Sequence, residues 1–182
     1  MIATTILFIL LGIAAATDVW RRRIYNWTTY PGMAAAFACS GAVGLGWRSP
    51  EVQTVLGRTS FGESVAGLLV CGSVMLACCV LFNVGGGDVK LIAMLGAFLG
   101  PNRGVEAMLW TFVVGGCVGA TVLVMRIGPV ESLRRVFVHA WSALRVGYIS
   151  GPTSEEREHL RAPLFLAPCA LAAAAIVHSG WG

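Results

Sequence analysis

The fold is set by a stretch without any charged side chain, MIATTILFILLGIAAAT at residues 1–17. About 20 apolar residues in a helix cross the hydrocarbon core of a bilayer, within a range of roughly 17–25. Comparable apolar stretches recur along the chain, and we expect further spans at residues 28–47, 64–84, 89–100, 105–125 and 162–178. The sequence therefore predicts an all-α fold, a polytopic membrane helix bundle of about six transmembrane helices.

The composition also favours a membrane protein. Of the 182 residues, 57% are hydrophobic and only 12% are charged, with a mean hydropathy of +0.76. An average soluble domain carries about 25% charged residues. A soluble chain of this length would lack the polar residues needed to cover its surface, whereas lipid accepts apolar surface directly.

The fourth expected span, residues 89–100, is short and is ended by Pro101. It can cross a bilayer only by including the glycines before it, by thinning the bilayer, or by lying inside the bundle. Glycines are frequent from the third to the fifth span, and small residues let membrane helices approach closely. We interpret the following glycines as packing positions: Gly67, Gly72, Gly96, Gly115, Gly116 and Gly119.

A signal peptide is the alternative interpretation of the first span, because Ala14-Ala15-Ala16 resembles a cleavage site. Signal peptides carry their basic residues before the apolar region, but here Arg21-Arg22-Arg23 follow it. We therefore expect a retained helix with its N-terminus outside. Loops 18–27, 85–88 and 126–161, with Lys90 at their edge, then carry ten basic residues on the cytoplasmic side, against three opposite. This distribution agrees with the positive-inside rule.

The longest of these loops contains a stripe of apolar residues at helical spacing, which includes Val130, Leu133, Phe137, Trp141 and Leu144. Such a stripe predicts an amphipathic cytoplasmic segment at about 127–161, lying on the membrane surface. With it, residues 1–182 form a single membrane domain.

Neither the cysteines nor the basic residues indicate a cofactor or a nucleic-acid partner. The six cysteines lie within apolar stretches without paired metal-ligand spacing, and the three histidines are isolated. The arginines lie between spans, not along one face. The sequence predicts no metal, no other cofactor and no nucleic acid.

Asp18 and Asp88 are the only two aspartates of the chain. Asp18 directly follows the first apolar span, and Asp88 follows three glycines and begins the fourth. Structural roles are possible for each: Asp18 could pair with Arg21 or Arg22, and Asp88 could cap a helix. The expected topology, however, puts both at one depth, and carboxylates at membrane depth usually indicate function.

Two carboxyl groups in one site cannot both ionise at low cost, so one stays protonated while the other is charged. The charged group can activate water and the neutral group can donate to a carbonyl oxygen. Gly85, Gly86 and Gly87, which lack a Cβ, would let a substrate backbone approach. Lys90 is expected to point away from Asp88 and to meet lipid headgroups.

Gly-Gly-Gly-Asp-Val-Lys-Leu-Ile, from Gly85, closely resembles the GxGD motif of intramembrane aspartic proteases in its type IV prepilin peptidase form. Asp-Val-Trp-Arg-Arg-Arg-Ile-Tyr-Asn, from Asp18, resembles the second aspartate motif of that family. Ile24 and Asn26 match it, while Tyr25 stands where proline is usual. The resemblance covers about residues 1–125.

The resemblance implies six spans and an endopeptidase that removes a basic leader from pilin-like precursors at the cytoplasmic face of the bacterial inner membrane. Asp18 and Asp88 would be catalytic, and Gly85, Gly86 and Gly87 would line the substrate. Because only a short connection joins the first two spans, the methylating domain of longer members is missing, as in the branch associated with Flp/Tad pili. Two alternatives are a small transporter with the aspartates as ion sites and a non-catalytic pilus-assembly subunit.

Overall fold

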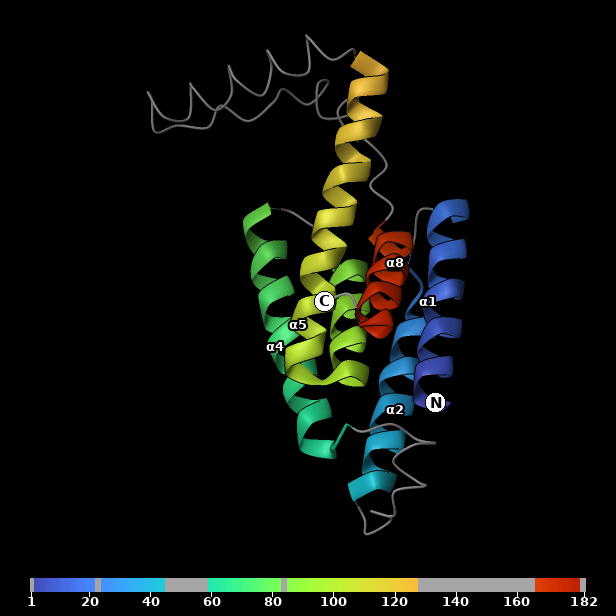
Figure 1. The fold of residues 1–182 in the computed structure, drawn as a ribbon, viewed down its shortest axis with the longest axis vertical. Coiled ribbons are helices and arrows are strands. Elements are labelled where there is room, and N and C mark those ends of the chain that lie inside the picture. Colours follow the sequence, from blue (N-terminus) through green and yellow to red (C-terminus); the bar gives the residue numbers. More distant parts are fainter. Residues whose placement is uncertain (1, 22–23, 45–58, 83–84, 128–165, 181–182) are drawn as a thin grey trace. The chain divides into compact units, whose positions relative to one another are not determined.

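The computed structural model describes residues 2–21, 24–44, 59–82, 85–127 and 166–180, and these residues are helical apart from short ends (Figure 1). The helices are α1 (Ile2–Arg21), α2 (Asn26–Gly44), α4 (Phe61–Phe82), α5 (Gly86–Ile127) and α8 (Leu166–Ser179). The predicted all-α fold is confirmed. The amphipathic segment expected up to residue 161 lies, beyond Ile127, outside the described residues.

The chain divides into two compact units, one formed by Met1–Val114 with Phe165–Gly182 and the other by Gly115–Leu164. All contacts discussed below lie within the first unit.

Three of the described helices are long and apolar enough to cross a membrane: Ile2–Arg21, Phe61–Leu81 and Gly86–Val122. The 14-residue α8 is apolar but shorter. The sequence-based count of six spans is therefore not confirmed, although the membrane character of the protein is.

One face of α1 is buried and the other is exposed. The buried residues Leu7, Leu11, Ala14 and Asp18 recur every three or four positions, so they lie along one side of the helix. Large apolar residues such as Ile9 occupy the exposed side, as expected for lipid contact. The helix continues to Arg21, so Asp18 lies in its last turn, on the buried face.

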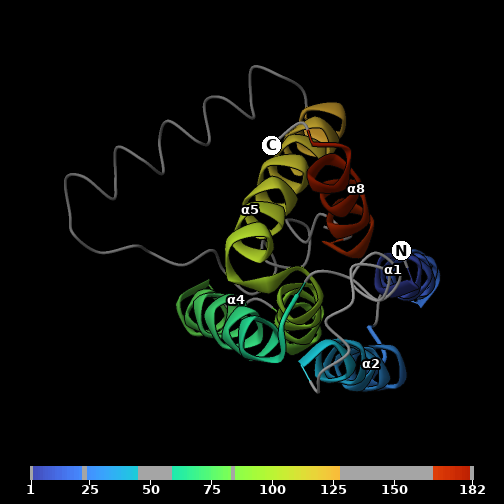
Figure 2. The same ribbon diagram turned by 60° about the horizontal axis from the view of Figure 1, so that its bottom comes forward.

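α1 packs against both α2 and α8, and Figure 2 shows α1 beside each of them. Phe8 on α1 and His178 on α8 meet edge to face, with ring centroids 5.9 Å apart. Gly12 on α1 faces Leu171 on α8, whose methyl group would lie 3.9 Å from an added Cβ. These contacts fix the position of α8 along α1.

The first part of α5 is the most deeply buried segment of the described chain. All residues from 91 to 98 are buried, including the large side chains of Leu91, Ile92, Met94 and Leu95. The helix begins at Gly86, so it also includes two of the three glycines. The short fourth segment thus lies inside the bundle and is lengthened at its start, two of the three possibilities that the sequence left open.

A break at Gly100 divides α5 into two parts. Gly100 has a φ of 78° and a ψ of 177°, a backbone conformation that L side chains rarely adopt. Pro101 follows as the first residue of the second part, where its missing N–H costs no helical hydrogen bond. The predicted end of the fourth span at this position is confirmed.

Small residues allow α4 and α5 to touch through their backbones. A Cβ on Gly67 would collide with the carbonyl oxygen of Gly96, and a Cβ on Gly96 would collide with that of Gly67. The buried hydroxyl of Ser64 donates to the carbonyl oxygen of Ala97 at 2.7 Å, and that of Thr59 donates to Phe98 at 3.1 Å. The interpretation of Gly67 and Gly96 as packing positions is confirmed.

We predict that Gly67→Ala lowers the free energy of unfolding by about 1–3 kcal/mol, the usual cost of overpacking, because the added methyl group meets the Gly96 backbone. Gly62→Ala on the same helix is the control, since a Cβ at Gly62 meets nothing within 4 Å. Thermal unfolding in detergent can be followed by the loss of helical circular dichroism. An unchanged melting temperature for Gly67→Ala would contradict the close packing.

Candidate functional site

Asp18 reaches the candidate site from the buried face of α1. Only 8% of its surface is exposed, and its Oδ2 accepts a hydrogen bond of 3.2 Å from the backbone N–H of Ala167. Ala167 is the second residue of α8, where backbone N–H groups have no partner within the helix. The carboxyl group of Asp18 therefore lies against the N-terminus of α8.

Asp88 lies in the first turn of α5, and its backbone N–H donates to the carbonyl oxygen of Gly85 at 3.0 Å. The Asp88 side chain is half-buried, and its carboxyl group lies close enough to that of Asp18 for the two to interact electrostatically. Asp18 on α1 and Asp88 on α5 are thus within range of an electrostatic interaction. Cys169 on α8, like Asp88, is a titratable side chain that interacts electrostatically with Asp18.

The three glycines before Asp88 have different surroundings. A Cβ on Gly85 would lie 3.4 Å from Oδ2 of Asp88, whereas a Cβ on Gly86 would meet nothing within 4 Å. A Cβ on Gly87 would come within 3.1 Å of the Cβ of Ile24. Gly87 therefore lets the segment between α1 and α2 approach α5, while Gly86 faces open space.

Lys90 contacts protein side chains of α2, which the sequence did not predict, and its expected contact with lipid headgroups stays a prediction. Its Nζ donates to Oδ1 of Asn26 at 2.8 Å and lies 5.0 Å from the centre of the Tyr30 ring. Asn26 begins α2, so the bond ties the start of α2 to the start of α5. Asn26 belongs to the motif that begins at Asp18 and Lys90 to the motif that begins at Gly85, but the sequence offered no signal that the two residues are bonded to each other.

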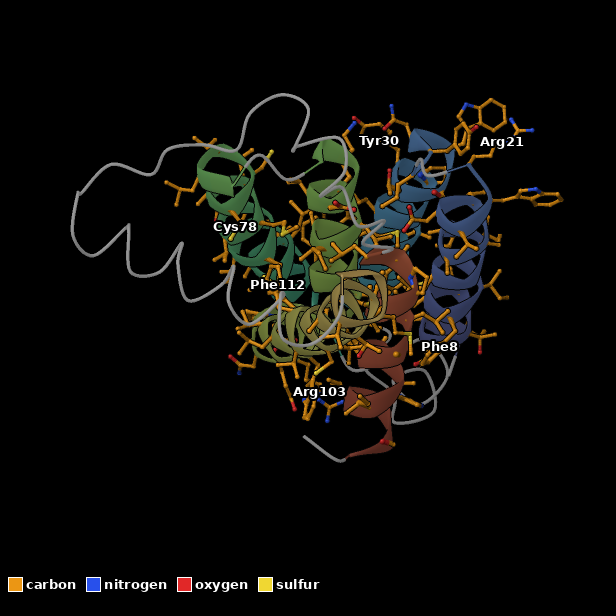
Figure 3. All side chains as sticks on the ribbon, turned by 90° about the horizontal axis from the view of Figure 1, so that it is seen from above. Phe8, Arg21, Tyr30, Cys78, Arg103 and Phe112 are labelled. Carbon is orange, nitrogen blue, oxygen red and sulfur yellow. The ribbon has the colours of Figure 1, made fainter. Side chains whose placement is uncertain are left out.

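Tyr25, which stands at the expected proline position, forms its own contacts. Its carbonyl oxygen accepts from both the backbone N–H and the hydroxyl of Thr28, at 3.1 and 2.8 Å. Its hydroxyl accepts from the Arg21 guanidinium at 3.5 Å. Figure 3 shows Arg21 of α1 and Tyr30 of α2 on one side of the view, and Arg103 of α5 on the opposite side.

Among the described residues, no group of three or more His, Cys, Asp or Glu side chains is placed to hold a metal ion.

The fold and the site together define a helical membrane protein in which two acidic side chains from different helices interact electrostatically. The model of the type IV leader peptidase family matches residues 5–120, well over half of the chain, and the protein belongs to this family. The resemblance found in the sequence is thereby confirmed, and so is its general consequence, a membrane peptidase. Asp18 and Asp88 both lie within the matched residues, and α8 lies outside them. No curated protein and no solved structure matches the chain significantly.

We predict that Lys90 and Asn26 are energetically coupled, by about 1 kcal/mol as for a single hydrogen bond in an exposed setting. The test is a double-mutant cycle of Lys90→Met and Asn26→Ala, with unfolding in detergent as the measurement. The double variant should be only slightly less stable than either single variant. Fully additive losses would mean that the bond contributes nothing.

Proposed function

We propose that this protein is a membrane aspartic endopeptidase that removes the leader peptide from prepilin or pseudopilin precursors, with Asp18 and Asp88 as its catalytic pair. The observation that supports the proposal most directly is the electrostatic interaction between these two carboxyl groups, which are 70 positions apart in the chain. Both lie in the part of the chain that the family model matches.

The proposed reaction needs only these two groups and water. One aspartate is ionised and takes a proton from water, whose oxygen then forms a bond to the scissile carbonyl carbon. The other aspartate donates its proton to the carbonyl oxygen, which gives a neutral tetrahedral diol. When the diol collapses, the C–N bond breaks and the amine nitrogen takes up the proton that the pair holds. One hydroxyl of the diol returns its proton to the pair, so a carboxylic acid and an amine are released and the pair again holds one proton.

The glycines beside Asp88 support the binding of an extended substrate. Gly86 faces open space and Gly85 lies next to the Asp88 carboxyl, so a peptide backbone could approach without meeting a Cβ. For the same steric reason we expect a glycine in the substrate just before the cut.

The surroundings of Asp18 support a site at the membrane surface. Trp20 and Trp27 are both 89% exposed, and Tyr30 is also exposed. Tryptophan and tyrosine collect at membrane–water interfaces. The excess of basic residues in the loops on this side supports a cytoplasmic orientation, with the N-terminus outside and the bacterial inner membrane as the location.

The short connection between α1 and α2 supports the peptidase-only branch associated with Flp/Tad pili. Only four residues separate Arg21 from Asn26, so a methylating domain cannot be inserted there. The partners of the protein would be the precursor peptides and membrane lipids.

We predict that Asp18→Asn and Asp88→Asn each reduce cleavage by about a thousandfold or more, because groups that act as one catalytic unit fail together. Precursor processing in cells carrying each variant can be followed by gel shift, with membrane insertion checked by immunoblot. Glu63→Gln is the matched control: Glu63 accepts the Ser60 N–H at the start of α4, and glutamine preserves such a cap. Normal processing by either aspartate variant would exclude the pair and favour a transporter or an assembly subunit.

We also predict that the cut must lie at the membrane surface. Moving the cleavage sequence stepwise into the apolar helix of the precursor should stop processing within several residues, because unwinding a helix in lipid exposes unpaired backbone groups. Purified enzyme in liposomes and a series of shifted precursors provide the measurement. Equal cutting at the bilayer centre would show that the site lies deeper than proposed.

A further inference from the structure

The hydrogen bond between Ala167 and Asp18 joins groups that are 149 positions apart in the sequence. The first N–H groups of any helix lack intrahelical acceptors, and in α8 the next residue, Pro168, has no N–H at all. The Ala167 N–H thus has no acceptor within α8, and it donates instead to Oδ2 of Asp18.

This contact favours the ionised form of Asp18. Burying a carboxylate is unfavourable unless it is paired or hydrogen-bonded, and Asp18 is only 8% exposed. The N–H bond supplies a partner, and the partial positive charge of a helix N-terminus acts in the same direction. Asp88 lies near enough to Asp18 for their charges to interact, so fixing the charge on Asp18 leaves the shared proton to Asp88.

The position of α8 is itself fixed by packing on α1. Ala167 and Ala170 are fully buried, and Leu171 faces Gly12. At the other end of α8, His178 meets Phe8 edge to face. The donor is therefore held by a packed helix and not by an exposed loop.

We propose that the N-terminus of α8 is a positioning element for Asp18, with the backbone N–H of Ala167 as the group that orients the carboxylate. This inference rests on the proposed peptidase function and extends it in two ways. It assigns Asp18 as the base that activates water and Asp88 as the proton donor, and it gives a role in the site to a helix outside the residues that the family model matches.

The titratable groups around Asp18 are few among the described residues. Asp88 on α5 and the buried thiol of Cys169 on α8 interact with it electrostatically. A test of the Ala167 bond therefore has to include Cys169→Ala, which removes the thiol and leaves the α8 backbone unchanged.

The experiment replaces Ala167 by lactic acid through nonsense suppression in cell-free synthesis into nanodiscs, so that an ester oxygen takes the place of the N–H. Ala173, also fully buried on α8, receives the same replacement as the control for an ester within the helix. Ala167→Gly keeps the N–H and removes only the methyl group. The substrate is a synthetic precursor with a basic leader, a glycine before the cut and an apolar helix, assayed from pH 4 to about 9 to cover the range of perturbed carboxyl groups.

We expect the Ala167 ester to lower kcat by about tenfold or more, the usual effect of losing one hydrogen bond to a charged group. KM should change little, and the acidic limb of the pH–rate profile should move to higher pH because the charged carboxylate has lost a donor. The Ala173 ester and Ala167→Gly should keep the wild-type pH–rate profile, and Cys169→Ala should keep its acidic limb, because a thiol is uncharged at acidic pH.

A wild-type kcat and profile for the Ala167 ester would overturn the positioning role, and so would the same change of profile in the Ala173 ester. Asp18→Asn and Asp88→Asn, assayed in the same nanodiscs, separate this result from a failure of the proposed function. If both are inactive while the Ala167 ester is normal, the aspartate pair stands and only the role of α8 is lost. If either aspartate variant cleaves normally, the catalytic pair itself is wrong.

Discussion

A hydrocarbon surrounding offers no water to a backbone N–H or to a carboxylate, so each buried polar group needs a partner within the protein. The helices of this protein are arranged around that requirement. Ser64 and Thr59 bond to carbonyl oxygens near the end of the first part of α5, where the break at Gly100 interrupts helical hydrogen bonding. Asp18 finds its partner at the start of α8, where an N–H group is free for the same reason. Helix ends and helix breaks thus meet polar side chains of neighbouring helices.

The buried first part of α5 explains how Asp88 is held. Its core residues, Leu91 to Phe98, are enclosed by other helices, and glycines on α4 and α5 allow the backbones to touch. A segment packed on all sides moves as part of the bundle, so its first turn, which carries Asp88, has a defined position relative to α1. The bond from Lys90 to Asn26 and the contact of Gly87 with Ile24 tie the same turn to the segment that leads into α2.

The two parts of the candidate site differ in their surroundings. Asp18 faces the interior and the α8 N-terminus, whereas Gly86, two residues before Asp88, faces open space. An extended peptide could therefore reach the two carboxyl groups from the side of the glycines. On the other side, α8 supplies a hydrogen-bond donor to Asp18. Such a division between a fixed, hydrogen-bonded acid and a more accessible one is what a water-activating pair of carboxyl groups requires.

The sequence by itself predicted the helical membrane fold, because apolar runs of this length suit a bilayer, and it predicted the break just before Pro101, because proline disrupts a helix except in its first turn. It also made Asp18 and Asp88 the candidate site residues and predicted close packing at Gly67 and Gly96, since charged or Cβ-free residues are conspicuous in an apolar chain; at Gly116, which it grouped with them, an added Cβ would meet nothing within 4 Å. Only the tertiary structure decided that Asp18 lies on a buried face, that Lys90 bonds to Asn26, and that Ala167 donates to Asp18. The role of Ala167 could not be predicted from the sequence, because it acts through its backbone N–H, a group that every residue except proline carries. Whether that N–H meets a carboxylate depends on how α8 packs against α1, and this packing is set by contacts between residues far apart in the chain.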